Sequence, residues 1–124
     1  MAGNILIVDQ EQEKREFLKT LLEKRSCKVT VLEDAYSINN ILREKTFDII
    51  FLDILTVGIR DIHLLANINR KYPGSYIILI TSRHGNGFVK AAMDVGIYGC
   101  INKPFNIDEV LTMVKYLIPD KKLE

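Results

Sequence analysis

The sequence predicts an α/β fold in which helices cover both faces of a parallel, doubly wound β-sheet. Five short apolar segments alternate along the chain with five segments whose apolar residues recur at helical spacing. Three of the apolar segments run directly into a polar residue, which is Asp9, Asp53 or Thr81. Because parallel strands need crossover helices and are buried on both faces, this alternation favours a parallel sheet.

The first three strand–helix pairs follow from the apolar pattern. Segments 5–8 and 29–32 are short runs of aliphatic and β-branched residues, as buried strands are. Segment 47–53 ends on Asp53, and because a charge inside such a run would lose its hydration, Asp53 marks the end of the strand. Apolar residues at i, i+1, i+4 and i+5 indicate an amphipathic helix at 10–25. Apolar residues three and four apart indicate two more, at 38–45 and from Ile62 to the turn at Pro73-Gly74.

The last two pairs carry clearer end signals. Segment 76–80 is the fourth strand, and the turn Gly85-Asn86-Gly87 leads to a helix over 88–95 that Gly96 ends. A weaker fifth strand is predicted at 98–102. The final helix over 107–118 begins after Asn106, which is a good N-cap residue, and Glu109 three residues later completes a capping-box pattern.

Composition indicates an ordinary globular domain. Of 124 residues, 48% are hydrophobic and 27% charged, with a net charge of only +1, so direct nucleic-acid binding by this domain is not expected. We expect one domain over 1–124, with an ordered core over about 4–118 and a tail or linker start over 119–124. Neither a membrane segment nor a signal peptide is apparent, so the expected location is the cytoplasm, with Cys27 and Cys100 as buried thiols.

The predicted topology brings four polar residues to one place. We expect the flavodoxin-like (βα)5 arrangement, with strand order 2-1-3-4-5 and a switch point between the first and third strands. The carboxyl ends of parallel strands lie at one edge of the sheet, which is where ligands bind in such folds. Asp9, Asp53 and Thr81 end three strands there, and Lys103 follows the fifth.

This set of residues suits phosphoryl chemistry. Two neighbouring carboxylates repel each other unless a cation neutralises them, and Lys103 supplies one positive charge. Mg²⁺ favours sites made of one or two carboxylates with phosphate oxygens and water. Asp53 would act as the nucleophile that forms an acyl phosphate, with Asp9 holding the metal. Thr81 would donate a hydrogen bond to the phosphoryl oxygens, and Lys103 would pair with another.

The ordered motifs resemble those of one family over essentially the whole chain. The motifs are Ile5-Leu6-Ile7-Val8-Asp9, Ile49-Ile50-Phe51-Leu52-Asp53, Ile78-Leu79-Ile80-Thr81-Ser82 and Lys103-Pro104-Phe105. Together they are similar to the receiver domain of two-component response regulators. The resemblance implies a phosphorylation-controlled signalling switch rather than an enzyme.

The resemblance also implies a role for each site residue. Asp53 matches the aspartate that a histidine kinase or phosphotransfer protein phosphorylates. Asp9, Asp53 and the main-chain carbonyl of Leu55 match the family's Mg²⁺ ligands. Thr81 matches the conformational-switch hydroxyl and Lys103 the family's lysine, and the Lys103–Pro104 peptide is cis in much of the family.

Three positions depart from the family pattern. Gln10 replaces the second acid after the first strand, which predicts weaker Mg²⁺ binding unless Glu11 compensates; Glu11 could equally face solvent. Val57 stands where proline is usual. Cys100 replaces the switch aromatic, and Tyr98, two residues earlier on the same face of a regular strand, could take that role instead. The alternative is therefore a degenerate pseudo-receiver, an interaction module that acts without phosphorylation.

Other functions fit the residues less well. Haloacid-dehalogenase-type phosphatases need a second acid two residues after the nucleophile, and Leu55 stands there. An FMN site is disfavoured because Asp9 and Glu11 would repel its phosphate. A receiver would have a kinase or phosphotransfer partner, with an effector domain after Glu124 or a homodimer as possible outputs and no membrane contact.

Overall fold

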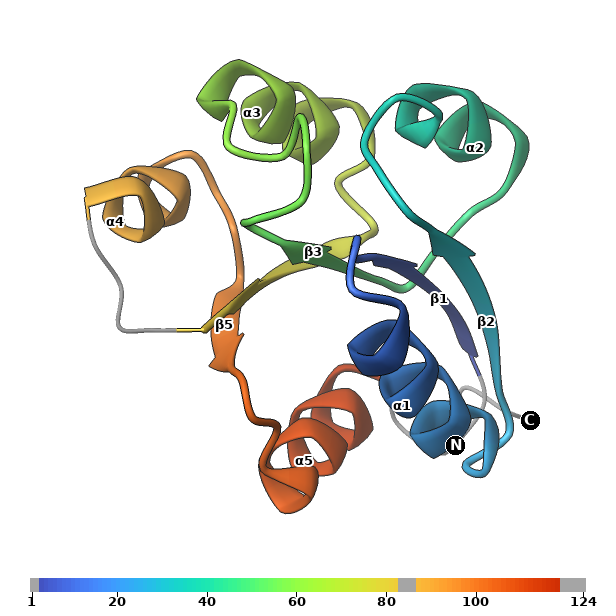
Figure 1. The fold of residues 1–124 in the computed structure, drawn as a ribbon. Helices are drawn as coiled ribbons and strands as arrows, with labels where there is room; N and C mark the ends of the chain where they lie inside the picture. The colour runs from blue at the N-terminus through green and yellow to red at the C-terminus, as the bar shows by residue number, and fades with distance from the viewer. Residues whose placement is uncertain (1–2, 83–86, 119–124) are drawn as a thin grey trace.

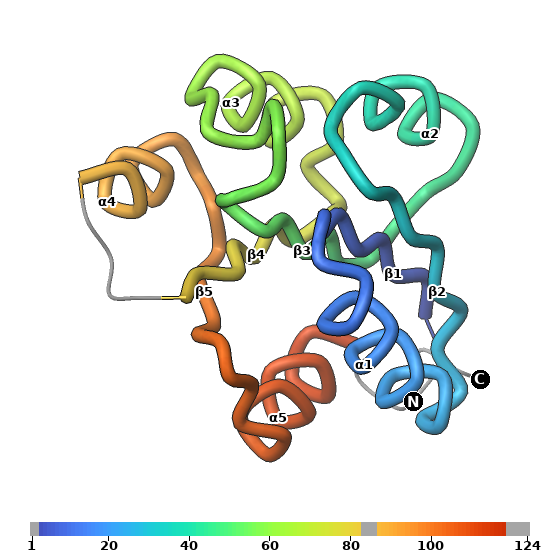
Figure 2. Tube along the Cα trace, viewed as in Figure 1, coloured from blue at the N-terminus to red at the C-terminus, as the bar shows by residue number. Residues whose placement is uncertain are grey.

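The fold comprises a parallel sheet with helices on both faces, as the sequence predicts. The computed structural model describes residues 3–82 and 87–118. Within these residues the strands lie in the order β2-β1-β3-β4-β5 (Figures 1 and 2). The strands are β1 (Gly3–Val8), β2 (Cys27–Leu32), β3 (Ile49–Asp53), β4 (Tyr76–Thr81) and β5 (Gly99–Asn102). The helices are α1 (Gln12–Glu23), α2 (Ile38–Glu44), α3 (Ile62–Lys71), α4 (Gly87–Asp94) and α5 (Ile107–Leu117).

Two apolar cores hold the layers together, one on each face of the sheet. Helices α2, α3 and α4 lie on one face, and α1 and α5 lie on the other (Figure 1). Alternate residues of each central strand enter opposite cores, so Ile50 and Leu52 pack in the first and Ile49 and Phe51 in the second. All five residues of β3, Asp53 included, are buried. Asp53 is therefore fixed between neighbours on both sides.

The ends of the elements agree closely with the sequence signals. Asn106 caps α5, and its side chain accepts a hydrogen bond from the Glu109 backbone N–H at 3.0 Å. Gly96 follows α4 with φ of +105°, and a Cβ there would lie 2.1 Å from Asn69 Nδ2, so only glycine fits. The predicted strand at 47–53 begins two residues later, at Ile49. Residues 85 and 86 of the predicted turn and the predicted tail at 119–124 lie outside the described residues.

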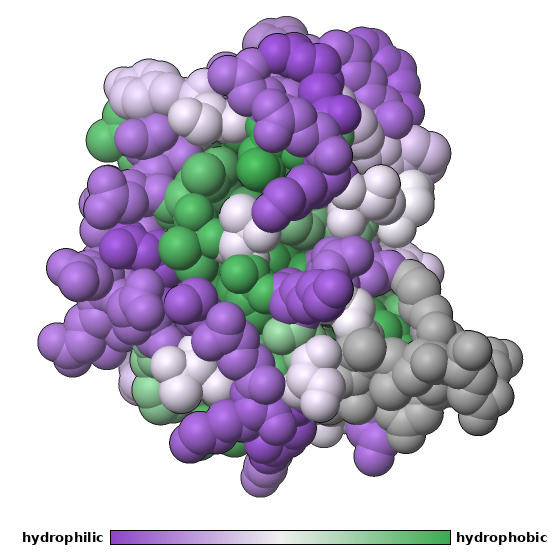
Figure 3. Space-filling view, turned by 90° about the vertical axis from the view of Figure 1, so that its right-hand side faces the viewer, coloured by the Kyte–Doolittle hydropathy of each residue, from purple (hydrophilic) through white to green (hydrophobic). Residues whose placement is uncertain are grey.

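The sheet has one notably apolar edge. Strand β2 ends the sheet, and its residues Val29, Val31 and Leu32 are only partly buried against the two cores. Figure 3 shows this side of the molecule, with apolar surface gathered in the middle and hydrophilic residues around it. None of the helices in the described ranges is both long enough and apolar enough to span a bilayer.

One prediction about the cysteines is wrong. Cys27 is buried, as expected, and burial raises the pKa of its thiol. Cys100 is exposed instead. It lies on the edge strand β5, where the neighbouring Ile101 takes the inward position, so the alternation of the strand directs Cys100 outward.

Candidate functional site

The carboxyl ends of β1 and β3 and the segment after β5 bring two acids and a lysine together. Asp9 follows β1, Asp53 ends β3, and Lys103 follows β5. Lys103 Nζ lies 3.0 Å from Asp9 Oδ2 and 3.6 Å from Asp53 Oδ1. The Lys103–Pro104 peptide is cis. The geometry that the parallel topology predicts for these three side chains is present in the structure.

Glu11 is a further acid at this site. Its carboxylate accepts a hydrogen bond from Lys103 Nζ, and its backbone N–H donates to Asp9 Oδ1 at 2.9 Å. One ligand oxygen from each of Asp9, Glu11 and Asp53 lies within 4.8 Å of the other two. Of the two orientations that the sequence leaves open for Glu11, the structure therefore has the one that faces the site.

The two aspartates are buried without full hydrogen bonding. Asp9 and Asp53 are both 0% exposed. Asp9 Oδ2 and Asp53 Oδ1 have no hydrogen-bond partner among the described residues, although both lie near the Lys103 ammonium. Buried carboxylate oxygens without a full set of donors are costly, and such atoms call for an explanation, of which a reactive role or a bound ion is one. They are the oxygens that a cation or an incoming group would contact.

The charges perturb one another in opposite directions. Burial raises the pKa of Asp53 and the negative charge of Asp9 raises it further, against the charge of Lys103 and hydrogen bonds from Thr56 and the Leu55 backbone. Burial acts to lower the pKa of Lys103, but its contacts with Glu11 and Asp9 and the charge of Asp53 outweigh burial and raise it. Lys103 is therefore a firmly charged ammonium, whereas Asp53 holds its negative charge at a cost.

Thr56 is a site residue that sequence reasoning missed. Its buried hydroxyl donates to Asp53 Oδ2 at 2.9 Å and accepts from the Gln10 backbone N–H at 3.0 Å. Loop threonines serve many purposes, so the sequence alone does not mark Thr56 as a site residue. The one hint is that it lies three residues after Asp53. The hydroxyl ties the β3 loop to the β1 loop and orients one oxygen of Asp53, which leaves Oδ1 for chemistry.

Arg15 stabilises the loop that carries Asp9. It lies in α1 and is only 6% exposed, although the helical pattern predicted no role for it. Its Nη1 donates to the Asp9 backbone carbonyl at 2.9 Å. Because this bond engages the backbone, Arg15 fixes the loop after β1 without neutralising the Asp9 carboxylate directly.

The remaining predicted residues lie around this centre. Thr81 is buried at the end of β4, and its carbonyl accepts from the Lys103 N–H at 2.7 Å. Leu55 contributes its backbone to Asp53 while its side chain is 52% exposed. The Gln10 side chain is exposed. Val57 is also exposed, in the loop after β3.

The donor set fits a hard divalent cation. The groups are carboxylate oxygens, which Mg²⁺ prefers over nitrogen or sulfur ligands. Two of these oxygens, Asp9 Oδ2 and Asp53 Oδ1, are buried, and in the described residues they have no hydrogen-bond partner other than the nearby Lys103 ammonium. The arrangement can therefore hold a cation beside a carboxylate and an ammonium group, which are the components that phosphoryl transfer requires.

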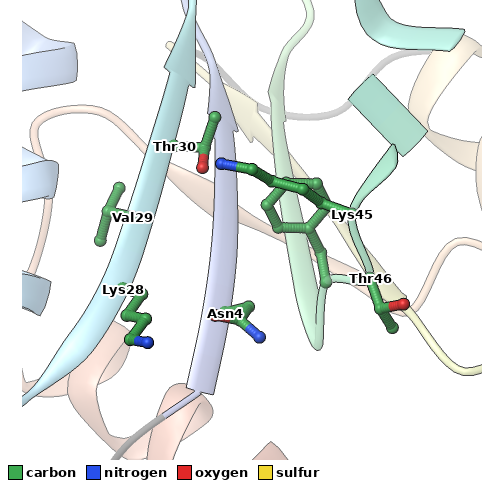
Figure 4. Close-up of a pocket in the computed structure, with 7 residues that line it drawn as sticks. Asn4, Lys28, Val29, Thr30, Lys45 and Thr46 are labelled. Carbon is green, nitrogen blue, oxygen red and sulfur yellow. The ribbon is translucent and has the colours of Figure 1, made fainter. Parts of the chain in front are cut away.

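A second hollow lies at the opposite end of the strands. It has a volume of about 450 Å³ and contains two lysines, Lys28 and Lys45, both exposed. Figure 4 shows the Lys45 side chain extending over the sheet in the direction of Thr30. The other lining residues are Asn4, Val29, Thr30, Thr46 and Phe47. Its charged groups remain solvated, so the burial and charge coupling of the Asp53 site are absent from this hollow.

Curated relatives of the chain are response regulators. The nitrogen assimilation regulatory protein NtrX of Azorhizobium caulinodans is 32% identical and aligns with 99% of this chain but only 28% of its own length. The DNA-binding transcriptional regulator NtrC of Escherichia coli is 27% identical over 94% of this chain and 25% of its own length. The chain thus spans about a quarter of the length of these relatives.

Solved structures and a family model agree with these relatives. NtrX from Brucella abortus matches 99% of this chain and 29% of its own with a TM-score of 0.84 and 26% identity. A response regulator from Thermotoga maritima has the same fold, with a TM-score of 0.84 at 22% identity over 95% of this chain and 98% of its own. The family model described as the response regulator receiver domain matches residues 5–115. The chain therefore belongs to the response regulator receiver domain family.

Proposed function

We propose that this receiver domain accepts a phosphoryl group on Asp53 from a histidine kinase or phosphotransfer protein and thereby switches a partner-binding surface. The observation that carries the proposal is the Asp53 carboxylate itself. It is 0% exposed as a residue, its Oδ1 has no hydrogen-bond donor, and the Lys103 ammonium lies 3.6 Å from that oxygen. A buried, charge-coupled carboxylate at the end of a strand is typical of a reactive group.

The chemistry assigns one task to each side chain. Asp53 Oδ1 attacks phosphorus while the bond from phosphorus to the donor breaks and the donor leaves with the bonding electron pair. Thr56 holds Asp53 Oδ2 through the bond of 2.9 Å, so the other oxygen is directed to the phosphoryl group. Lys103 supplies positive charge for the phosphoryl oxygens, and the Thr81 hydroxyl donates to another of them.

A divalent cation such as Mg²⁺ would be held by Asp9, Asp53 and the Leu55 carbonyl. When bound, it supplies charge neutralisation for the phosphoryl oxygens. Asp9 remains fixed meanwhile, because Arg15 holds its backbone carbonyl and the Glu11 N–H holds its Oδ1. A fixed Asp9 would hold its carboxylate in place for the cation.

The output would pass through β4 and β5. The Thr81 carbonyl accepts from the Lys103 N–H, so a movement of either residue toward the phosphoryl group is shared by both strands. Next to these strands lie exposed apolar residues: Met93 on α4, Tyr98 just before β5, and Ile107 and Tyr116 on α5. Phosphorylation would shift the populations of two states of this surface, and a partner or a second copy of the chain would read it.

The experiment is intact-mass measurement after incubation with Mg²⁺ and acetyl phosphate. We expect the native chain to gain the mass of one phosphoryl group and Asp53→Ala to gain none. Asp94→Ala, which removes an exposed acid at the end of α4, is the matched control and should behave as the native chain does.

A native chain that gains no mass would contradict the proposal. It would favour the alternative of an interaction module that acts without phosphorylation, in which Asp53→Ala leaves partner binding unchanged. The proposal also places the chain in the cytoplasm beside its kinase, and assigns any DNA binding to other domains of longer regulators such as NtrC rather than to this one.

A further inference from the structure

The Lys103 ammonium occupies the space that a cation would need. It lies 3.0 Å from Asp9 Oδ2 and 3.6 Å from Asp53 Oδ1, and it donates a hydrogen bond to Glu11. The oxygens of these three acids lie within 4.8 Å of one another. An ammonium group and a metal ion cannot both lie at the centre of one such cluster, because they need the same oxygens.

We propose that Glu11 is a cation ligand that replaces the acid missing at position 10, and that Lys103 is an internal counter-ion which the cation displaces from the cluster. In the cation-free state Glu11 and Lys103 are paired with each other. When a cation occupies the cluster, Glu11 exchanges the ammonium for the ion and Lys103 becomes available to a phosphoryl oxygen. This last step rests on the proposed phosphoacceptor function.

The local structure explains why Glu11 rather than Gln10 serves the site. The Gln10 backbone N–H is held by Thr56, and the Gln10 side chain is exposed. Glu11 is the N-cap residue of α1, yet its side chain makes no capping hydrogen bond to the helix. It reaches Lys103 instead, and its backbone is fixed on Asp9 Oδ1 at 2.9 Å. A glutamate side chain is one methylene group longer than an aspartate side chain. This extra length lets a residue at position 11 reach the site that an acid at position 10 would otherwise serve.

The buried oxygens are independent support for a ligand at this place. Asp9 Oδ2 and Asp53 Oδ1 belong to side chains that are 1% exposed, and apart from the Lys103 ammonium at 3.0 and 3.6 Å neither has a hydrogen-bond partner in the described part of the chain. Three carboxylates face a single ammonium, so the cluster keeps an excess of negative charge. A divalent ion would offset this excess better than the lysine does.

The first test measures cation affinity directly, with Mn²⁺ as the probe. Free Mn²⁺ is followed by electron paramagnetic resonance as it is titrated with the full chain, with no phosphodonor present. We expect Glu11→Gln to weaken binding by about tenfold or more, as losses of residues around metal sites commonly do. Glu13→Gln removes an equal charge two residues later on the exposed side of α1 and should bind Mn²⁺ as the native chain does.

The second test is a substitution that should raise the Mn²⁺ affinity instead of lowering it. Lys103→Met should bind Mn²⁺ more tightly than the native chain, because the ion no longer has to displace an ammonium group. Lys14→Met is the control for charge alone, since the charge of Lys14 also acts on Glu11, and its effect should be clearly smaller. Circular dichroism melting of each variant, with and without Mn²⁺, verifies that the chain measured is folded.

Any of three results would overturn the proposal. These are a Glu11→Gln chain that binds Mn²⁺ as the native chain does, a Lys103→Met chain that binds it no more tightly, and a native chain that binds no Mn²⁺. Because Glu11 is about half exposed, its variant should fold even if that of Lys103 does not. A native chain that binds Mn²⁺ through Glu11 but is never phosphorylated would instead refute the proposed function.

Discussion

The two ends of the parallel sheet treat polar residues in opposite ways. At the carboxyl ends of the strands, Asp9 and Asp53 are 0% exposed, and each has one oxygen with no partner in the described structure beyond the Lys103 ammonium. At the amino ends, Lys28 and Lys45 are exposed. Asp48 there accepts a hydrogen bond from the Asn4 N–H at 2.9 Å.

This contrast separates structural polar groups from functional ones. The amino-end groups either remain hydrated or complete the backbone, as when Ser75 Oγ donates to the Phe47 carbonyl at 2.6 Å. The carboxyl-end groups are buried against like charge, an arrangement that a protein tolerates only where another feature compensates for it. Substitutions of the same chemical kind should therefore differ in effect, and even in sign, between the two ends.

The largest difference is expected between two lysines. Lys103→Met leaves the carboxylates of the site without their counter-ion, which should lower the free energy of unfolding by about 3 kcal/mol in cation-free buffer. Lys45→Met at the other end changes an exposed side chain and should alter it by less than about 0.5 kcal/mol. Urea unfolding measures both values. Equal effects would mean that the carboxylates do not depend on Lys103 for neutralisation.

Two aspartates should respond with opposite signs. Burial and the charge of Asp9 raise the pKa of Asp53, so Asp53→Asn should increase the free energy of unfolding at neutral pH. Asp48→Asn weakens the acceptor of the Asn4 N–H and should decrease it by about 0.5 kcal/mol. A loss of stability in Asp53→Asn would contradict the claim that the Asp53 charge is held at a cost.

The advantage of Asp53→Asn should depend on pH. The pKa of Asp53 is higher in the folded chain than its ordinary value of 3.8, so the folded state binds its proton more readily than the unfolded state does. The stability that protonated Asp53 contributes to the folded state is therefore fully present below pH 3.8. It is lost as the pH rises through the higher pKa of the folded chain. The difference between native and variant chains should be largest at neutral pH and vanish in acid, as urea unfolding at a series of pH values would show.

The sequence was sufficient where a residue's position depended on topology, and insufficient where it depended on a loop conformation. Asp9, Asp53 and Lys103 follow strands whose order the alternation predicts, so their approach could be anticipated. Glu11 and Thr56 lie in the loops after β1 and β3. There the backbone conformation of the loop determines whether a side chain faces solvent or the site. Periodicity carries no information about that choice.

Thr56 therefore provides the most sensitive test of the difference between polar groups at the two ends of the sheet. Thr56→Val removes the donor to Asp53 Oδ2, and Ser75→Ala removes a buried hydroxyl that donates to the backbone at the amino end. Each should lower the free energy of unfolding by about 1 kcal/mol. Only Thr56→Val should also raise the pKa of Asp53, because the bond that it removes acts to lower that pKa. The loss in Thr56→Val should consequently shrink in acid, whereas that of Ser75→Ala should not. Identical pH profiles for the two variants would show that Thr56 only braces its loop, as Ser75 does.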